Sequence, residues 1–339
     1  MADNGRPDKK VLITGGAGFI GTHLARYLIA HNNTCQVDLV DNFARGVNDD
    51  AIQRMAQKPN VHLHTLNILE PEALTDLDTD YDYVYHLAAI IGVANVLERP
   101  YEVLRNNVVM LLNMLDWASR QTDLQRLVFA STSEVYAGTL RHFALPLPTP
   151  EVTPLALTDL GHPRTSYMLS KIYGEALCHQ SGLPFTIFRP HNIYGPRMGL
   201  AHVIPELLQK AHRASDGDEF EVFSVDHRRA FCFIGDAVEM IVRASEAPDG
   251  AGQTLNLGNQ DAEVSIGELV QVILDTVGKR LRMSPQPATP GSPARRCPDM
   301  TQTQALTGVR AQVSLHEGVK QTYQWYRDNV FDQHNISAR

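Results

Sequence analysis

The sequence has few cysteines, no long apolar run and no excess of positive charge. Four cysteines occur among 339 residues and no two form a C-x-x-C pair, so we expect no disulfide framework, no metal site and a reducing, cytoplasmic setting. No stretch of about 18 apolar residues occurs, and residues 1–10 are polar and charged. We therefore expect neither a transmembrane helix nor a signal peptide.

The charge and composition also limit the class of protein. The 38 acidic residues exceed the 30 basic ones, for a formal charge of -8, which argues against a broad surface for nucleic acid. With 43% hydrophobic and 20% charged residues, the chain can bury a sizeable core. At about 150 residues per domain, the length predicts two domains or one large α/β unit with a smaller lobe.

Short runs of β-branched and apolar residues alternate with helical stretches through the first half of the chain. The clearest helical stretch is 103–119. Because parallel neighbours need crossover connections, this alternation predicts a doubly wound, mostly parallel α/β sheet of the Rossmann type. The predicted strands are 11–13, 37–40, 61–64, 83–87, 127–130 and 184–188.

Three glycines lie between the first predicted strand and the helix after it. Gly15, Gly18 and Gly21 would let the backbone turn sharply and approach a pyrophosphate, which the helix N-terminus favours. Asp41 ends the second strand, where a carboxylate can bind an adenine ribose and repel a 2′-phosphate. Both features predict NAD, although Arg45 keeps NADP open. The alternative is a plain tight turn and a solvated strand end.

Polar residues follow the fifth strand and open the helix before the sixth. Ligands bind at such strand ends in open α/β sheets, and residues 131–136 read STSEVY. Tyr167 and Lys171 lie four apart on one helix face, so the ammonium is expected to lower the pKa of the phenol. The phenolate could then take a proton from a substrate hydroxyl, with Thr132 bonded to the same oxygen. The alternative is an exposed helical pair beside a polar turn.

Together these motifs resemble the extended short-chain dehydrogenases/reductases, specifically their nucleotide-sugar epimerase, dehydratase and decarboxylase group. The resemblance covers most of the chain and specifies the family more than the reaction. The matching segments are TGGAGFIG at 14–21, DN at 41–42, HLAA at 86–89, NNVVMLLNML at 106–115, STSEVY at 131–136, YMLSK at 167–171, RPHNIYGPRM at 189–198, HRRAFCFIGD at 227–236 and RRCPDM at 295–300.

The resemblance implies a role for many residues. Tyr167 is implied as the catalytic base, Lys171 as its support and Thr132 as the third member, with Ser133 and Glu134 beside them. The implied NAD-binding residues are Gly15, Gly18, Phe19, Ile20, Gly21, Asp41, Asn42, Asn67, Ile68, Leu87, Ala88, Ala89, Asn107, Tyr167, Lys171 and Pro190. The implied substrate-binding residues are Asn192, Arg197, Arg229, Arg295 and Arg296. Asn67 and Ala137 depart from the family, which usually has Asp and Gly there.

The same resemblance suggests how the chain is organised. Residues 1–195 would form the NAD-binding domain, and 196–330 mainly a smaller substrate-binding lobe with segments returning to the first domain. Residues 331–339 would be a frayed tail. The five prolines in 137–164 predict a long loop. Relatives dimerise through a four-helix bundle, here formed by helices near 97–118 and 166–181.

The reaction is less well specified than the family. Such enzymes oxidise a sugar hydroxyl, usually at C4, to a transient ketone. Ser133 is a poor general acid, which disfavours 4,6-dehydration. STSEVY resembles the decarboxylases of UDP-glucuronate, in which Glu134 would orient the uronate, act as a base or be structural. Residues 199–204 lack the arginine usual in those relatives, so 4-epimerisation of a UDP-hexose or UDP-hexuronate is the first expectation and decarboxylation the second.

A protein that binds NAD without catalysis is the alternative of a different class, because fold alone does not dictate function. Tyr167 and Lys171 are both present, which favours an enzyme.

Overall fold

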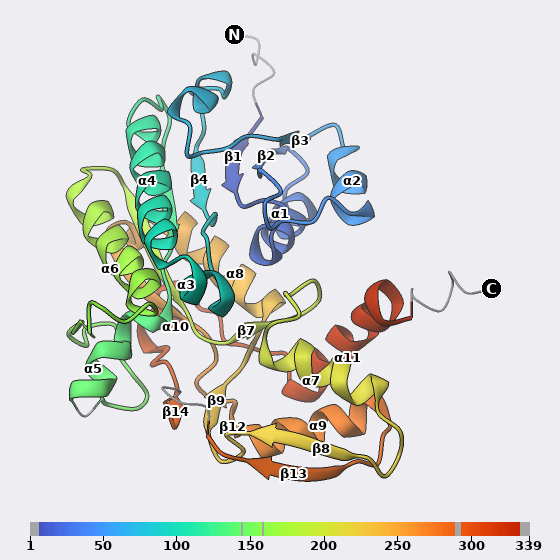
Figure 1. Ribbon diagram of the computed structural model, residues 1–339. Coiled ribbons are helices and arrows are strands. Elements are labelled where there is room, and N and C mark those ends of the chain that lie inside the picture. Colours follow the sequence, from blue (N-terminus) through green and yellow to red (C-terminus); the bar gives the residue numbers. More distant parts are fainter. Residues whose placement is uncertain (1–6, 144, 158, 289–292, 333–339) are drawn as a thin grey trace.

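The computed structural model describes residues 7–143, 145–157, 159–288 and 293–332 (Figure 1). Its centre is a seven-stranded sheet in which every neighbouring pair is parallel. The strand order is β11-β6-β5-β4-β1-β2-β3, so the order reverses between β1 and β4. The strands are β1 (Lys9–Thr14), β2 (Cys35–Val40), β3 (Val61–His64), β4 (Tyr83–His86), β5 (Arg126–Ala130), β6 (Phe185–Pro190) and β11 (Gln253–Leu257). The predicted doubly wound α/β class is confirmed.

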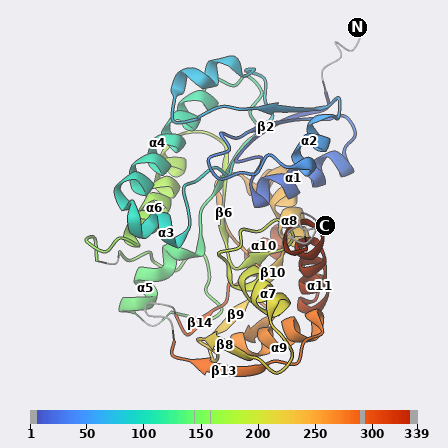
Figure 2. The ribbon, with the colours of Figure 1, turned by 45° about the vertical axis from the view of Figure 1, so that its right-hand side comes forward.

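Helices cover both faces of this sheet (Figures 1 and 2). One face packs against α1 (Phe19–His31) and α8 (Ile234–Glu246), and the other against α4 (Pro100–Ala118) and α6 (Thr165–Gln180). In β1, Val11 and Ile13 enter the first core and Leu12 enters the second. Both faces are buried, which explains why the strands are nearly continuous apolar runs.

The shorter elements cap and connect this layer. Pro100 begins α4, three residues before the predicted start, because proline fits the first turn of a helix. The other elements of this part are α2 (Asp50–Ala56), η1 (Pro71–Asp76), α3 (Val93–Glu98), η2 (Ser133–Tyr136), α5 (Ala137–His142) and η3 (Pro248–Gly250).

The smaller lobe lies below the sheet in Figures 1 and 2. Its strands form three small sheets, β13–β8, β12–β9–β14 and β10–β7. The strands are β7 (Ile193–Tyr194), β8 (Glu219–Phe223), β9 (Arg228–Ala230), β10 (Cys232–Phe233), β12 (Glu263–Ser265), β13 (Arg282–Gln286) and β14 (Arg295–Arg296). The helices are α7 (Val203–Arg213), α9 (Ile266–Val277), α11 (Leu315–Tyr326) and η4 (Arg327–Phe331), whereas α10 (Thr301–Thr307) returns to pack against α8 and β11 of the sheet layer.

The predicted loop 137–164 and the predicted tail 331–339 have different outcomes in the structure. The predicted loop 137–164 begins with the six-residue helix α5, which lies ahead of the first of its prolines, Pro146. Of the predicted tail, 333–339 lie outside the described residues. None of the helices in the described ranges is long and apolar enough to cross a membrane.

Candidate active site

The turn from β1 to α1 can only be made with glycine. Gly15 has a φ of +70°, and a Cβ added there would lie 2.9 Å from the Ala88 nitrogen. A Cβ added at Gly21 would lie 2.3 Å from the Gly15 carbonyl oxygen. Gly18 is the N-cap of the 13-residue helix α1 and supplies no side-chain cap, so the N–H groups of its first turn remain for a ligand. This cradle fits the pyrophosphate of a dinucleotide.

Asp41 lies at the carboxyl end of β2 and shapes the loop that follows. Its Oδ2 accepts a hydrogen bond from the Ala17 nitrogen at 3.0 Å, and its Oδ1 accepts one from the Phe43 nitrogen at 2.9 Å. Burial raises the pKa of Asp41 from its ordinary value. Each oxygen keeps further acceptor capacity, which suits the two hydroxyls of a ribose.

The Asn107 side chain is hydrogen-bonded to the backbone of the segment after β4, which is implied to contact NAD. Its Oδ1 accepts from the Ile90 nitrogen at 2.7 Å and its Nδ2 donates to the Ile90 carbonyl at 3.1 Å. The side chain is buried, so it holds the strip that contains Ala88 and Ala89 in place. Asn67, in contrast, is partly exposed and bonds locally to Glu70 at 2.9 Å. Contact of either residue with NAD stays a prediction.

The catalytic set predicted from the sequence is brought together. Tyr167 and Lys171 stand one turn apart on α6, and the Tyr167 phenol is hydrogen-bonded to Thr132, the N-cap of η2. The Lys171 Nζ donates to the Ala130 carbonyl at 2.7 Å and lies 5.9 Å from the centre of the Tyr167 ring. The set therefore joins the end of β5 to α6.

The electrostatics of this pair differ from the expectation. Burial raises the pKa of Tyr167 to about 12, and the hydrogen bond with Thr132 offsets only part of that rise. Burial lowers the pKa of Lys171 to about 8. The ammonium points to a carbonyl rather than to the phenol oxygen, so desolvation outweighs its attraction for the phenolate.

A buried ionic network behind the catalytic set was missed in the sequence. Glu175 accepts a hydrogen bond from the Ser131 hydroxyl at 2.5 Å and forms an ion pair with Arg189 at 2.6 Å. Both charged side chains are 6% exposed, and the network fixes the 131–136 segment against α6 and β6. The available signal was Glu175 four residues after Lys171, on the same face of the helix.

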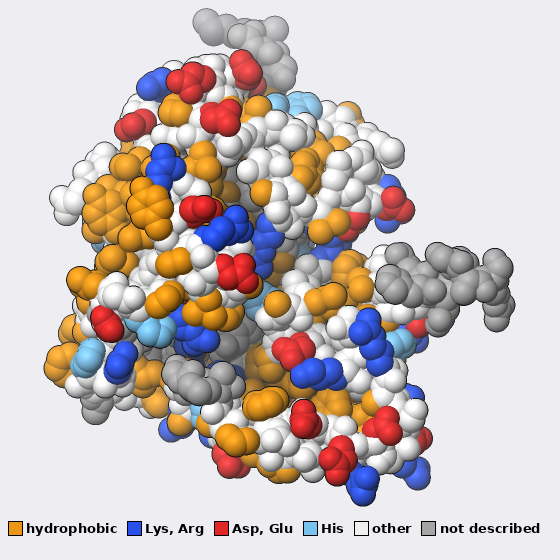
Figure 3. Space-filling model, in the orientation of Figure 1, with side chains coloured by type: hydrophobic (Ala, Val, Ile, Leu, Met, Phe, Trp, Pro, Cys, Tyr) orange, Lys and Arg blue, Asp and Glu red, His pale blue; other side chains and the backbone are white. Residues whose placement is uncertain are grey.

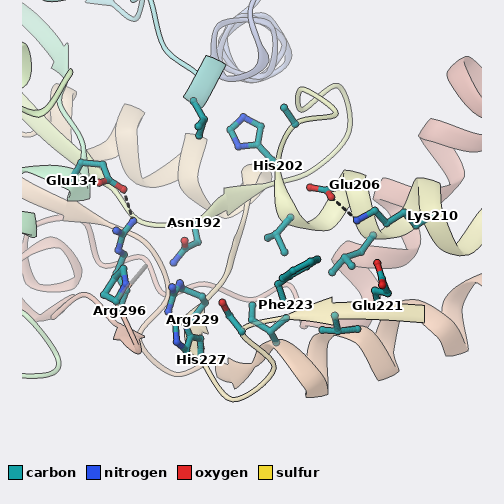
Figure 4. Close-up of a pocket in the computed structure, with 18 of the residues that line it drawn as sticks. Glu134, Asn192, His202, Glu206, Lys210, Glu221, Phe223, His227, Arg229 and Arg296 are labelled. Carbon is teal, nitrogen blue, oxygen red and sulfur yellow. Dashed lines mark hydrogen bonds and ion pairs between the residues drawn. The ribbon is translucent and has the colours of Figure 1, made fainter. Parts of the chain in front are cut away.

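A cavity of about 530 Å³ opens between the sheet and the smaller lobe, large enough for a small-molecule ligand (Figure 4). Figure 3 shows Lys and Arg side chains gathered in the hollow on this side of the molecule. At one end of the cavity lie Glu134, Asn192, Arg229 and Arg296. The other end is lined by Glu206, Lys210, Glu221 and Phe223, which also were not predicted.

Glu134 and Arg296 form an ion pair at one end of this cavity (Figure 4). The Arg296 Nη1 donates to the Glu134 Oε1 at 2.9 Å. The positive charge of Arg296 holds the pKa of Glu134 below its ordinary value and outweighs the effect of partial burial, since the Glu134 side chain is 44% exposed. Arg229 lies beside them, its Nη1 donating to the Arg228 carbonyl at 2.7 Å, and burial lowers its pKa to about 10. These groups give the cavity a cationic end with one ionised carboxylate.

Two arginines predicted to bind substrate are engaged elsewhere. Arg295 is half exposed and forms a two-point ion pair with Glu263, at 3.0 and 2.7 Å. Arg197 is buried against the glycine turn and forms an ion pair with Asp49 at 2.8 Å. All three of its guanidinium nitrogens donate hydrogen bonds to protein oxygens. In this structure, protein acceptors engage both guanidinium groups, and contact of either with a substrate stays a prediction.

The sequence model of the NAD dependent epimerase/dehydratase family matches residues 11–258. The chain belongs to this family. A UDP-N-acetyl-alpha-D-glucosaminuronate decarboxylase of Bacillus cytotoxicus is 33% identical over 333 residues, which cover 94% of this chain and 98% of the relative. A UDP-glucuronic acid decarboxylase of Xenopus tropicalis is 31% identical over 96% of this chain and 74% of its own length.

Solved structures of the family are also similar. A Thermotoga maritima UDP-glucose 4-epimerase has a TM-score of 0.80 at 26% identity, covering 95% of this chain and 99% of that one. A Bacillus cereus UDP-glucuronic acid 4-epimerase with NAD has a TM-score of 0.79 at 25% identity, covering 94% and 99%. The predicted family, fold class and NAD dependence are confirmed, and the chain is an enzyme of the nucleotide-sugar epimerase/decarboxylase group.

Proposed function

We propose that this enzyme is an NAD-dependent decarboxylase of a UDP-linked hexuronate, acting through a transient 4-keto sugar. The observation that carries this proposal is the Glu134–Arg296 ion pair, which lines the cavity beside the catalytic set. An arginine suits the carboxylate of a uronate, and its carboxylate partner holds it in place. A neutral hexose offers no carboxylate to this arginine.

The first step uses the residues at the end of β5 and on α6. Tyr167 takes the proton of the sugar O4, and Thr132 is hydrogen-bonded to the phenol and lies beside the same oxygen. NAD, held by the β1–α1 glycine turn and Asp41, would supply the hydride acceptor for the oxidation at C4 and the hydride donor for the later reduction. Lys171 supplies a positive charge close to the phenol ring.

Oxidation at C4 makes the uronate a β-keto acid. The C5–C6 bond can then break, its electron pair moving toward the C4 carbonyl as carbon dioxide leaves. The developing negative charge falls on the oxygen next to Tyr167 and Thr132, whose O–H groups can stabilise it. A proton is then added at C5. In this proposal the Arg296 guanidinium, paired with Glu134, holds the substrate carboxylate before this step.

The nucleotide end of the proposal rests on the cationic cavity and on the relatives. Arg229 lines the cavity and matches the place where the family presents a guanidinium to a diphosphate. The Bacillus cytotoxicus and Xenopus tropicalis relatives are named as decarboxylases of UDP-linked uronates. We therefore infer a UDP-hexuronate as the substrate.

The second candidate is 4-epimerisation of the same substrate class, the first expectation from the sequence. It is favoured by residues 199–204, where Ala201 and His202 line the cavity in place of an arginine. The similar Bacillus cereus structure is that of a UDP-glucuronic acid 4-epimerase. In that reaction the hydride returns to the opposite face of the ketone and no carbon is lost.

We also propose a homodimer through a four-helix bundle. Helices α4 and α6 pack against each other and expose apolar side chains on their outer surface, together with α3 (Figures 1 and 3). The exposed residues are Leu97, Tyr101, Leu112 and Tyr173. The four cysteines are free and buried, in keeping with the proposed cytoplasmic location.

The deciding experiment is to incubate the protein with NAD and, separately, UDP-glucuronate, UDP-N-acetylglucosaminuronate and UDP-glucose. Products are followed by mass spectrometry with chromatography that resolves isomers. We expect a UDP-pentose that has lost the mass of carbon dioxide from one of the uronates. An isomer of unchanged mass from a uronate would select the second candidate, and turnover of UDP-glucose alone would contradict both.

A further inference from the structure

The segment that leads from the sheet into the smaller lobe is tied to the NAD-binding loops by one arginine. Arg197 Nη1 donates to the Thr22 hydroxyl at 2.6 Å and to the Ala17 carbonyl at 3.4 Å, both at the glycine turn. Its Nε and Nη2 donate to the Asp49 Oδ2 at 3.0 and 2.8 Å, and Nη2 also reaches the Val47 carbonyl at 3.1 Å. The guanidinium thus joins three separate stretches of chain.

Two of these stretches surround the place proposed for NAD. Ala17 and Thr22 belong to the turn that cradles the pyrophosphate, and Asp41 bonds to Ala17 from the adenosine side. Val47 and Asp49 end the loop that begins at Asp41. The charge of Arg197 also acts on the Asp41 carboxylate. Arg197 therefore links the glycine turn to the end of the 41–49 loop, and Asp41 links the start of that loop to the same turn.

The third stretch, residues 196–202, leads to the wall of the substrate cavity. Arg197 itself has a φ of +66°, a left-handed conformation that is costly for a residue with a Cβ and persists only when its surroundings hold it. His23 Nε2 bonds to the Pro196 carbonyl at 3.0 Å, and the Tyr326 hydroxyl bonds to the Met198 carbonyl. Four residues later, Ala201 and His202 line the cavity.

We propose that Arg197 is a positioning residue that couples the binding of NAD to the binding of the nucleotide sugar. The side chain is 4% exposed, and its contacts are made with the NAD-binding loops rather than with the cavity. Ordering of residues 41–49 by NAD then also orders residues 196–202, so the second ligand meets a wall that is already in place. The substrate half of this inference rests on the proposed function.

Asp49 allows the contact to be broken selectively. Its Oδ1 caps α2 by accepting from the Ala51 and Ile52 nitrogens at 3.1 Å, whereas its Oδ2 accepts only from Arg197 among the bonds described. Asparagine is as good an N-cap as aspartate. Asp49→Asn keeps the cap through its oxygen and turns an amide donor toward the guanidinium. The matched control is Asp50→Asn, which makes the same charge change at the next, exposed residue.

The experiment measures two affinities by calorimetry on full-length protein freed of bound nucleotide. NAD is titrated alone, and UDP is titrated with and without saturating NAD. In the wild type and in Asp50→Asn we expect NAD to tighten UDP binding about fivefold. In Asp49→Asn we expect the affinity for NAD to weaken about tenfold. We also expect saturating NAD to leave the affinity of this variant for UDP unchanged. Arg197→Lys, which keeps the charge but loses the planar fork, should behave like Asp49→Asn.

The possible outcomes separate the two ideas. Equal NAD affinity and equal coupling in Asp49→Asn and Asp50→Asn would overturn the role of Arg197. Weaker NAD binding with intact coupling would overturn the link to the substrate lobe. Absence of UDP binding in the wild type would contradict the proposed substrate class, and the NAD titration would still decide whether Arg197 positions the cofactor loops. Melting curves confirm that each variant is folded.

Discussion

Arg296 donates a hydrogen bond of 2.9 Å to Glu134, a residue 162 positions earlier in the chain. This pair joins β14 of the smaller lobe to η2 at the end of β5, and it lies in the wall of the cavity. It places an ionised carboxylate and a guanidinium beside Thr132. The proposal of a uronate substrate rests on this pair.

Replacing Glu134 tests that dependence. Glu134→Gln keeps the size of the side chain but removes its charge, so Arg296 loses its ionic partner and decarboxylation is expected to fall about 100-fold. The assay is release of labelled carbon dioxide from UDP-glucuronate or UDP-N-acetylglucosaminuronate. Equal activity of Glu134→Gln and the wild type would remove the pair from the mechanism.

The pH dependence of this pair has a definite sign. Arg296 lowers the pKa of Glu134 in the folded protein, so the stabilisation is present above the unfolded pKa and is lost as the pH falls through the lower, folded value. The difference in melting temperature between wild type and Glu134→Gln should therefore shrink below about pH 4. A difference that grows on acidification would contradict the assignment.

Tyr167→Phe is expected to bind NAD normally and to lose about 1,000-fold in turnover, because only the phenol O–H is removed. Calorimetry with NAD and the turnover assay are compared on the same preparation. Tyr323→Phe, on α11 and outside the cavity lining, is the matched control and should match the wild type. Turnover of Tyr167→Phe near that of the control would exclude Tyr167 as the base.

Burial of Lys171 predicts a stability that rises with pH. Its pKa is about 8 in the folded protein against an ordinary 10.5, so the unfolded chain binds more protons between these values. The cost of burying the ammonium is full below pH 8 and is relieved as the pH approaches 10.5. Wild type should therefore gain melting temperature over this window relative to Lys171→Met. Surface Lys58→Met should show no such change relative to wild type.

Asp41→Ala is expected to weaken the binding of NAD more than the binding of NADP. The substitution removes the acceptors for the ribose hydroxyls of NAD, and it also removes a charge that repels the 2′-phosphate of NADP. The loss for NAD should be about tenfold, including the bonds that Asp41 makes to the Ala17 and Phe43 nitrogens. Fluorescence titrations with both dinucleotides measure it. An equal loss for both would assign Asp41 to the loop alone.

Arg229 and Arg228 provide a neighbouring pair for testing the nucleotide site. Arg229 lines the cavity, whereas Arg228 is 41% exposed and lies near Glu263 and Glu268. Arg229→Gln should weaken UDP binding about tenfold, and Arg228→Gln should have little effect. The same loss in both variants would indicate a general charge effect rather than a diphosphate contact.

Much of the fold, and the grouping of Thr132, Tyr167 and Lys171, could be predicted from local pattern. Six strands of the sheet, the glycine turn, Asp41, and Tyr167 with Lys171 are each specified by residues near one another in the chain. The alternation of strands and helices, the three-residue glycine spacing and the four-residue Tyr–Lys spacing carry that information. Chain order and the strand-end rule then place Thr132 beside the other two.

The partners of the charged side chains, in contrast, were decided by the tertiary structure. The family resemblance implied that Arg197 and Arg295 bind substrate, and it gave no sign that they pair with Asp49 and Glu263, on other elements. The sequence also left open whether Glu134 orients the uronate, acts as a base or is structural. It did not predict the seventh strand of the sheet, β11. The physical reason is range: periodicity and turn chemistry act over a few residues, whereas an ion pair depends on which distant segments the packed core brings within about 3 Å.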